Sequence, residues 1–387
     1  MEFRKIWSWM FIFILVMSLV STGRVAAEQG ISIVILVSNN EADSVVAESL
    51  ANLLNVSVVV TPWGIYNPNI TAEIVERMPD KVIIIGGPVA VPVEYEQDLN
   101  NLGISYERWY GANRYSTNIK VIEKAEEEFP GIFRDVDVFV VNGRDVGAIQ
   151  AVKKAGGRVV PIFVDYGLEN QTEVIGHLIT PGRVVIVRSP LLSLNLMLNI
   201  QEIVERNGIH VSEEQVEAGR NLSWSTIAGT EALLKLAKTT LDDLKVPGAR
   251  NMLELATREL EKAKTEYARG NYEAAYRYSI YARTHANVVI LLAGKERNRI
   301  LHGLPKVALE HDILRLEVQV NALSRSGIDV SDVQNLLAQA KAALQAGDLD
   351  SALEILRAVK EKLRALFINE KGKIRHEPVG HGRGRRP

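Results

Sequence analysis

The stretch Lys81-Val-Ile-Ile-Ile-Gly-Gly-Pro88 decides the fold. Its apolar run has no polar alternation, which is typical of a strand that is covered on both faces of a sheet. Similar runs lie upstream at residues 31–37 and 56–60, and helical patterns at 46–54 and 70–78 separate the three runs. Strands that alternate with helices predict parallel strands joined by right-handed crossovers.

The same pattern recurs about 100 residues later, which indicates an internal duplication. Three further strands are predicted at residues 137–141, 159–164 and 183–187. Pro88 and Pro190 both follow the third strand of their copy. The sequence therefore predicts a first α/β module at residues 31–128 and a second, degenerate α/β module at residues 135–220.

The second half of the chain has a different period. After Trp224 the apolar residues follow helical spacing to about residue 368. Breakers divide this half at Pro247-Gly248, Gly270, residues 303–305, Gly327 and Gly347. A continuous apolar seam consists of Leu309, Ile313, Leu316, Val320 and Leu323. The predicted fold class is α/β, with duplicated parallel-sheet modules followed by an all-α helical-hairpin bundle at residues 224–370.

Both ends of the chain have their own composition. Residues 1–27 combine Arg4 and Lys5 with an apolar run and end in Val25-Ala-Ala27, which predicts a signal peptide and an exported protein, extracellular or associated with the cell surface. Residues 371–387 are basic and rich in glycine, which predicts a disordered tail. Four Asn-x-Ser/Thr patterns predict glycosylation at Asn55, Asn69, Asn170 and Asn221.

Composition excludes several classes of function. The 387 residues contain no cysteine, so disulfide scaffolds and thiolate metal sites are excluded. The formal net charge of −2 provides no global attraction to nucleic acid. The seven histidines show no metal-ligand spacing, and no phosphate-binding loop or nucleophile elbow occurs. We therefore expect no catalytic residues, no metal, no cofactor and no nucleic-acid partner, and the chain is predicted not to be an enzyme.

Two blocks in the first module carry a resemblance to a known family. Residues 81–91, with Gly-Gly after the strand, and residues 107–117, with Arg-Trp-Tyr-Gly-Ala-Asn-Arg-Tyr-Ser-Thr from Arg108, are similar to the cell wall binding repeat type 2 family. The chain departs from that family at Asn113, where the family has Asp, and in the second copy, where Arg188-Ser189 replaces Gly-Gly. The resemblance implies non-covalent attachment to an envelope polymer, often an anionic glycan. It implies binding residues at Asp43, Gly86, Gly87, Arg108, Gly111, Arg114 and Tyr115.

Each of these residues also has a purely structural interpretation. Gly86-Gly87 either lets a ligand approach the strand end or forms a tight turn with positive φ. Arg108 and Arg114 either grip an anionic polymer or pair with acidic residues and join helix to sheet. Asp43, and Asp145 in the second module, are expected to cap the helices that begin beside them.

The preferred functional prediction is an exported, non-enzymatic cell-envelope protein that binds surface polymer through its α/β modules. A homo-oligomer is the expected way to complete the binding unit, because modules of the family usually occur in threes. One alternative is an extracellular adaptor that recognises a protein partner through the helical domain. Another is a soluble receptor that holds a small ligand between the two modules.

Overall fold

The computed structural model describes residues 31–241, 244–302 and 304–376. The predicted signal peptide at residues 1–27 lies outside this part of the chain. The first sheet is entirely parallel and has the order β2-β1-β3-β4. Its strands are β1 (Ile33–Ser38), β2 (Ser57–Thr61), β3 (Lys81–Ile85) and β4 (Ser105–Trp109). The stretch from Lys81 is thus a central strand, paired with both β1 and β4.

The second sheet repeats the first. It is also parallel, with the equivalent order β6-β5-β7-β8. Its strands are β5 (Arg134–Asn142), β6 (Val159–Val164), β7 (Thr180–Arg188) and β8 (Val211–Gln215). The identical strand order confirms the duplicated α/β fold that the sequence predicts.

The fourth strand of each sheet was not among the runs recognised in the sequence. β4 reads Ser105-Tyr-Glu-Arg-Trp109 and alternates between exposed and partly buried side chains up to the buried Trp109, and β8 is exposed beyond Val211. Neither strand therefore forms a continuous apolar run, unlike β6 at the opposite edge of the second sheet, which is buried along its whole length.

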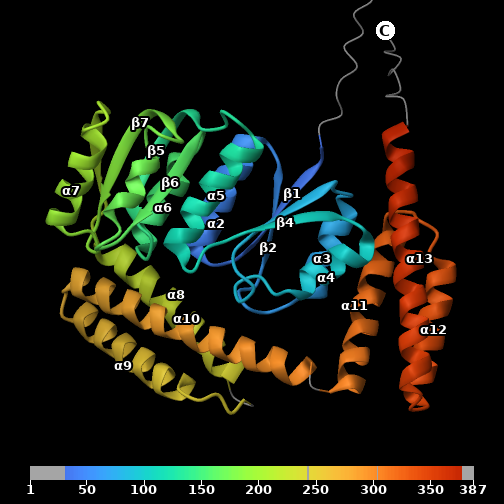
Figure 1. Cartoon of the computed structure of the whole chain (residues 1–387). Coiled ribbons are helices and arrows are strands. Elements are labelled where there is room, and N and C mark those ends of the chain that lie inside the picture. Colours follow the sequence, from blue (N-terminus) through green and yellow to red (C-terminus); the bar gives the residue numbers. More distant parts are fainter. Residues whose placement is uncertain (1–30, 242–243, 303, 377–387) are drawn as a thin grey trace, which may run out of the picture.

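Helices cover both faces of each sheet. The first module contains α2 (Glu41–Leu54), α3 (Pro68–Glu76), α4 (Glu94–Leu102) and α5 (Arg114–Glu128). The second contains α6 (Val146–Ala155), the 3-10 helix η1 (Glu169–Val174) and α7 (Leu194–Glu205). One hydrophobic core joins the α2 and α5 face of the first sheet to the second module. Figure 1 accordingly shows α2 and α5 between the two sheets. The modules therefore form one packed unit.

Six helices follow the second sheet. They are α8 (Arg220–Leu241), α9 (Ala249–Ala268), α10 (Tyr272–His302), α11 (Pro305–Arg325), α12 (Ser331–Gln345) and α13 (Leu349–His376). The turns of the α9/α10 and α12/α13 hairpins have the same conformation: Gly270 in the first and Gly347 in the second have φ of 82° and 80°. A left-handed glycine ends the first helix in both cases. The helical-hairpin half of the predicted fold class is thereby confirmed.

The helical half attaches to the first module in two places. The apolar seam of α11 is buried in a second hydrophobic core, together with α3, α4, α12 and α13. α8, α9 and α10 instead lie beneath both modules in Figure 1, across the ends of the strands. Helices that follow one another in sequence therefore cover different surfaces.

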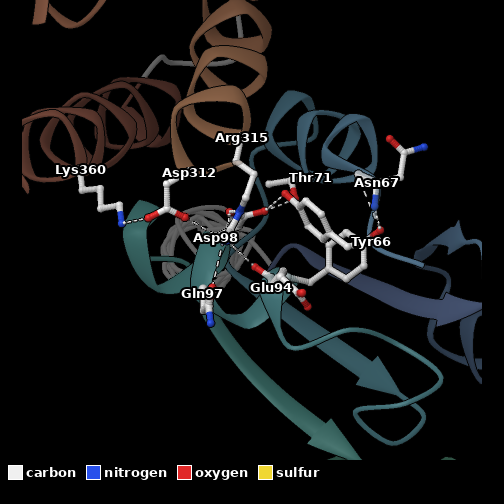
Figure 2. A network of polar contacts seen from close by, with 10 residues as sticks. Tyr66, Asn67, Thr71, Glu94, Gln97, Asp98, Asp312, Arg315 and Lys360 are labelled. Atoms are coloured by element: carbon white, nitrogen blue, oxygen red, sulfur yellow. Dashed lines mark hydrogen bonds and ion pairs between the residues drawn. The ribbon is translucent and has the colours of Figure 1, made fainter. Parts of the chain in front are cut away.

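A buried ion pair fixes α11 to α4. The Arg315 guanidinium donates to Asp98 Oδ1 from Nη2 at 2.6 Å, and these side chains are 5% and 1% exposed. The other Asp98 oxygen accepts from the Tyr66 hydroxyl at 2.5 Å and from Thr71 Oγ1 at 2.6 Å. Arg315 also donates to Gln97, Asp312 and the Glu94 carbonyl (Figure 2). Both charges are thus compensated without water.

The predicted disordered tail at residues 371–387 needs a correction. Its first six residues continue α13 as far as His376, and the remainder lies outside the described residues. Lys371 holds this last part of the helix because its ammonium group pairs with Asp80 at 2.8 Å and donates to the Pro79 carbonyl. Across the described residues no helix combines the length and apolarity that crossing a membrane requires.

Candidate functional site at the strand ends

The carboxyl ends of the strands are where open α/β sheets usually bind ligands. In this protein the helix α10 lies along those ends in both modules (Figure 1). Its 31 residues span about 46 Å at 1.5 Å per residue. Three contacts fix it, through Tyr276 near its start, Arg283 in its middle and Gly294 near its end.

The contact at Tyr276 joins α10 to the second module just after the end of β5. The buried Tyr276 hydroxyl donates to Asp145 Oδ1 and accepts the Gly147 N–H at 2.8 Å. Burial and the neighbouring Asp145 carboxylate raise the pKa of Tyr276 far above its usual value, so the hydroxyl keeps its proton. Asp145 also caps α6 by accepting from the Ala148 N–H at 3.0 Å, as its position predicts.

The other two contacts reach the first module. Arg283 forms an ion pair with Glu41, which lies in the first turn of α2. Further along, a Cβ on Gly294 would lie 3.1 Å from the Gly64 carbonyl oxygen, so glycine permits the close approach of α10 to the loop after β2. The ends of β1 and β2 are therefore covered by the chain's own helix.

Asp43 lies at this covered edge but does not cap α2. The cap is Asn40, whose side chain accepts from the Ala42 N–H. Expecting a cap at Asp43 was wrong because α2 begins at Glu41, which places Asp43 inside the first turn. Burial raises the pKa of Asp43 to about 6, and the Arg114 guanidinium opposes this shift.

The predicted glycines form turns inside the first module. Gly86 is buried with φ of 118°, a conformation that side chains disfavour. A Cβ on Gly87 would lie 3.2 Å from the Tyr110 ring, and one on Gly111 would lie 2.5 Å from Ser116 Oγ. The backbone conformation accounts for glycine at position 86, and close packing within the module accounts for it at positions 87 and 111.

Arg108 is bonded within its own module. Its Nε donates to Glu96 Oε1 at 2.6 Å, and its Nη1 donates to the carbonyl oxygens of Gly86 and Val91 at 2.8 and 2.9 Å. The side chain is 8% exposed. It therefore joins α4, β4 and the Gly-Gly turn.

Arg114 and Tyr115 join the first module to the second. Arg114 Nη1 donates to the Gly143 carbonyl at 2.8 Å, and the Tyr115 hydroxyl donates to Asp165 Oδ2 at 2.8 Å. Gly143 follows β5 and Asp165 follows β6. The Arg-Tyr pair therefore acts at the joint between modules. The structure brings Asp43, Gly86, Arg114 and Tyr115 to one edge of the first sheet, but it does not assemble the predicted binding residues on an open surface.

Three arginines lie close together where α10 crosses the two modules. Arg114, Arg144 and Arg283 line a cavity of about 10 Å³ there together with Glu41. Arg144 pairs with Asp165 at 3.3 Å, and Arg283 pairs with Glu41. A cavity of this size holds at most about one water molecule, so it excludes a polymer.

The four predicted glycosylation acceptors are all exposed: Asn55, Asn69, Asn170 and Asn221. Asn55 ends α2 in the left-handed conformation, and Asn221 lies in the first turn of α8. Their use as acceptors stays a prediction.

An open groove lies at the strand ends of the second module. It has a volume of about 680 Å³ and is formed by the loop after β7, the start of α7, the residues after β8 and one side of α10. Its lining residues include Arg188, Ser189, Gln215, Glu217, Glu273, Arg277 and Tyr281. The groove thus combines residues of the α/β part and the helical part.

The second module has a groove at this edge because a different residue follows its fourth-strand pairing position. In the first module Ile85 pairs with Trp109, and Tyr110 then packs on Gly87. In the second module Val187 pairs with Glu214, so the polar Gln215 takes the place that corresponds to Tyr110. The aromatic ring that fills this edge in the first module is therefore missing from the second.

The groove contains charged, polar and aromatic groups. Arg277 pairs with Glu273 at 2.8 Å, and Arg188 pairs with Glu213 at 3.3 Å. Tyr281 is 45% exposed, and Ser189 Oγ has no hydrogen-bond partner in the described part of the chain. In the sequence, the replacement of Gly-Gly by Arg188-Ser189 was interpreted as degeneration of the second module, and no site was predicted there. Arg277 gave no signal, because a helical Glu/Arg pair is ordinary on a solvated face.

Comparisons with known proteins find similarity over about half of this chain. No family model matches the chain. The uncharacterized protein MJ0755 of Methanocaldococcus jannaschii is 34% identical over 189 residues, which are 47% of this chain and 54% of that protein. The chain thus spans about half the length of this curated relative. Among solved structures, Cwp6 from Clostridium difficile aligns with a TM-score of 0.37 and 20% identity, over 49% of this chain and 30% of that chain. Membership of the cell wall binding repeat type 2 family therefore stays a prediction.

Proposed function

We propose that this protein is an exported, non-enzymatic cell-envelope protein that binds a surface polymer in the groove at the strand ends of its second module. The observation that carries the proposal is the 680 Å³ groove, which is the open counterpart of an edge that side chains fill in the first module. Its place at the carboxyl ends of β7 and β8 supports a ligand site, since ligands favour this edge of parallel sheets.

The arrangement of α10 supports the proposal further. The helix covers the strand ends of the first module and contributes Glu273, Arg277 and Tyr281 to the groove of the second. A site formed by two parts of one rigid unit holds its side chains in place for binding. The proposed attachment therefore needs both halves of the chain.

Retention on purified envelope material tests the proposal. Arg277→Ala is expected to weaken retention of the chain from Glu28 onward, because it removes hydrogen-bond donors from the lining of the groove. The matched control is Arg269→Ala. Arg269 also pairs with a nearby glutamate, Glu266, three residues before it in the chain, but it lies outside the groove. Equal retention of both variants and the unmodified chain would contradict the proposal and favour an adaptor that binds through another helical surface.

A further inference from the structure

The charges around the groove are balanced. Two arginines line it, Arg188 and Arg277, and each already has a carboxylate partner, Glu213 and Glu273. Glu217 adds a further carboxylate to the lining. An anionic polymer is held by cations that are free to receive it. The groove therefore offers no net attraction to a polyanion.

The lining suits a ligand that is rich in hydroxyl groups. Guanidinium groups donate, carboxylates accept, and the Gln215 amide does both. Such alternating donors and acceptors match hydroxyls, each of which donates once and accepts twice. The half-exposed Tyr281 ring adds an apolar face with a polar end, which suits the C–H face of a sugar.

An aromatic row begins where the groove ends. Trp224 is 56% exposed, and its ring lies 5.4 Å from that of Tyr267, which lies 5.3 Å from that of Tyr272. The row is next to the groove in the chain, because Tyr272 precedes Glu273, which lines the groove.

We propose that the ligand is an uncharged glycan chain, which binds in the groove against Tyr281 and continues onto the aromatic row at Trp224. This inference rests on the proposed function and specifies the class of polymer. It differs from the anionic glycan that the sequence resemblance implies, since Arg108 and Arg114 are bonded inside the molecule.

Competition with fractionated polysaccharide tests the class of ligand. Envelope polysaccharide is released and separated by anion exchange into an uncharged and an acidic fraction, and each is added to the full-length mature chain bound to envelope. The uncharged fraction is expected to displace the protein, with an affinity that changes less than twofold between about 0.05 and 0.5 M salt, because screening does not weaken uncharged contacts. Displacement by the acidic fraction alone, or a steep loss of affinity with salt, would overturn the inference.

Chain length and two variants test the path. Tyr281→Ala is expected to weaken binding of short and long uncharged fragments by about twofold to tenfold, and Trp224→Ala only that of long ones. Tyr166→Ala is the control, because this exposed tyrosine does not line the groove. Equal effects of Trp224→Ala on short and long fragments would contradict the extended path. If neither fraction displaces a protein whose retention still depends on Arg277, the glycan inference fails while the groove proposal stands. If retention does not depend on Arg277, the proposed function itself fails.

Discussion

At the scale of single residues, the partner decides what a motif residue does. Arg108 has the chemistry to grip an anion, but a carboxylate and two carbonyl oxygens already accept its hydrogen bonds. Arg114 has a carbonyl partner in the other module. The sequence can predict that such an arginine has hydrogen-bond acceptors in the fold, since a buried guanidinium group needs them. The identity of the acceptor depends on the packing of segments that are far apart in the chain.

Asp43 is a partly buried acid whose desolvation is only partly offset by the charge of Arg114. Its pKa is raised to about 6, against 3.8 for the ordinary group. A carboxyl whose pKa is higher in the folded state adds stability fully below pH 3.8 and loses it as the pH rises through 6. Asp43→Asn is therefore expected to stabilise the protein relative to the unmodified chain by on the order of 2 kcal/mol at pH 7, and by little at pH 4.

Denaturant unfolding of both proteins at a series of pH values measures this difference. Comparing the two chains cancels the contribution of His311, whose pKa is lowered by burial and Arg315, because it is the same in both. The matched control is Asp137→Asn, an exposed aspartate in β5 that pairs with Arg183. A difference between Asp43→Asn and the unmodified chain that does not change from pH 4 to pH 7 would contradict the assignment.

At the scale of helices and strands, the sequence predicts what local periodicity and breakers determine. β3 occupies the predicted residues 81–85, and the breakers at Gly270, Gly327 and Gly347 lie at the ends of α9, α11 and α12. The fourth strand of each sheet, β4 and β8, had no such signal, and neither had the path of α10. Where a long helix lies is decided by distant contacts such as Tyr276 to Asp145, which are 131 residues apart in the chain.

The same contact allows a test of how α10 is held. Tyr276→Phe leaves a buried Asp145 carboxylate without its hydroxyl donor and the Gly147 N–H without its acceptor. The free energy of unfolding is expected to fall by about 2–3 kcal/mol, since a buried group left unsatisfied costs its full desolvation. Tyr281→Phe, on the same helix but half exposed, is expected to change it by less than about 0.5 kcal/mol.

Thermal and denaturant unfolding measure both tyrosine variants. Hydrogen exchange locates the effect, which is expected in α6 and the first turns of α10. Exchange that increases only in α9 would show that the hydroxyl does not hold α10 on the second module. That result would also remove the physical reason for the fixed geometry of the groove.

At the scale of the whole molecule, the protein is one unit in which each half completes the other. The helical half buries the α3 and α4 face of the first module, and α10 lies along the strand ends of both modules. The sequence predicted the helical half as a separate bundle because its periodicity shows an apolar face but not the surface that covers it. The seam from Leu309 to Leu323 packs on α3 and α4 as well as on its neighbouring helices.

The Arg315–Asp98 pair tests this unity. Arg315→Met leaves a buried carboxylate that still accepts from Tyr66 and Thr71 but lacks its cation, so the free energy of unfolding is expected to fall by about 3–5 kcal/mol. Arg325→Met is the matched control: Arg325 lies on the same helix and pairs with Glu76 of α3, but its side chain is 64% exposed. An exposed pair contributes at most about 1 kcal/mol.

Adding Asp98→Asn to Arg315→Met removes the unpaired charge and is expected to recover part of the loss. Because α11–α13 share their core with the first module, hydrogen exchange in Arg315→Met is expected to rise in α4 and α11 together. A rise in α11 alone would mean that the helical half can detach while the first module stays folded.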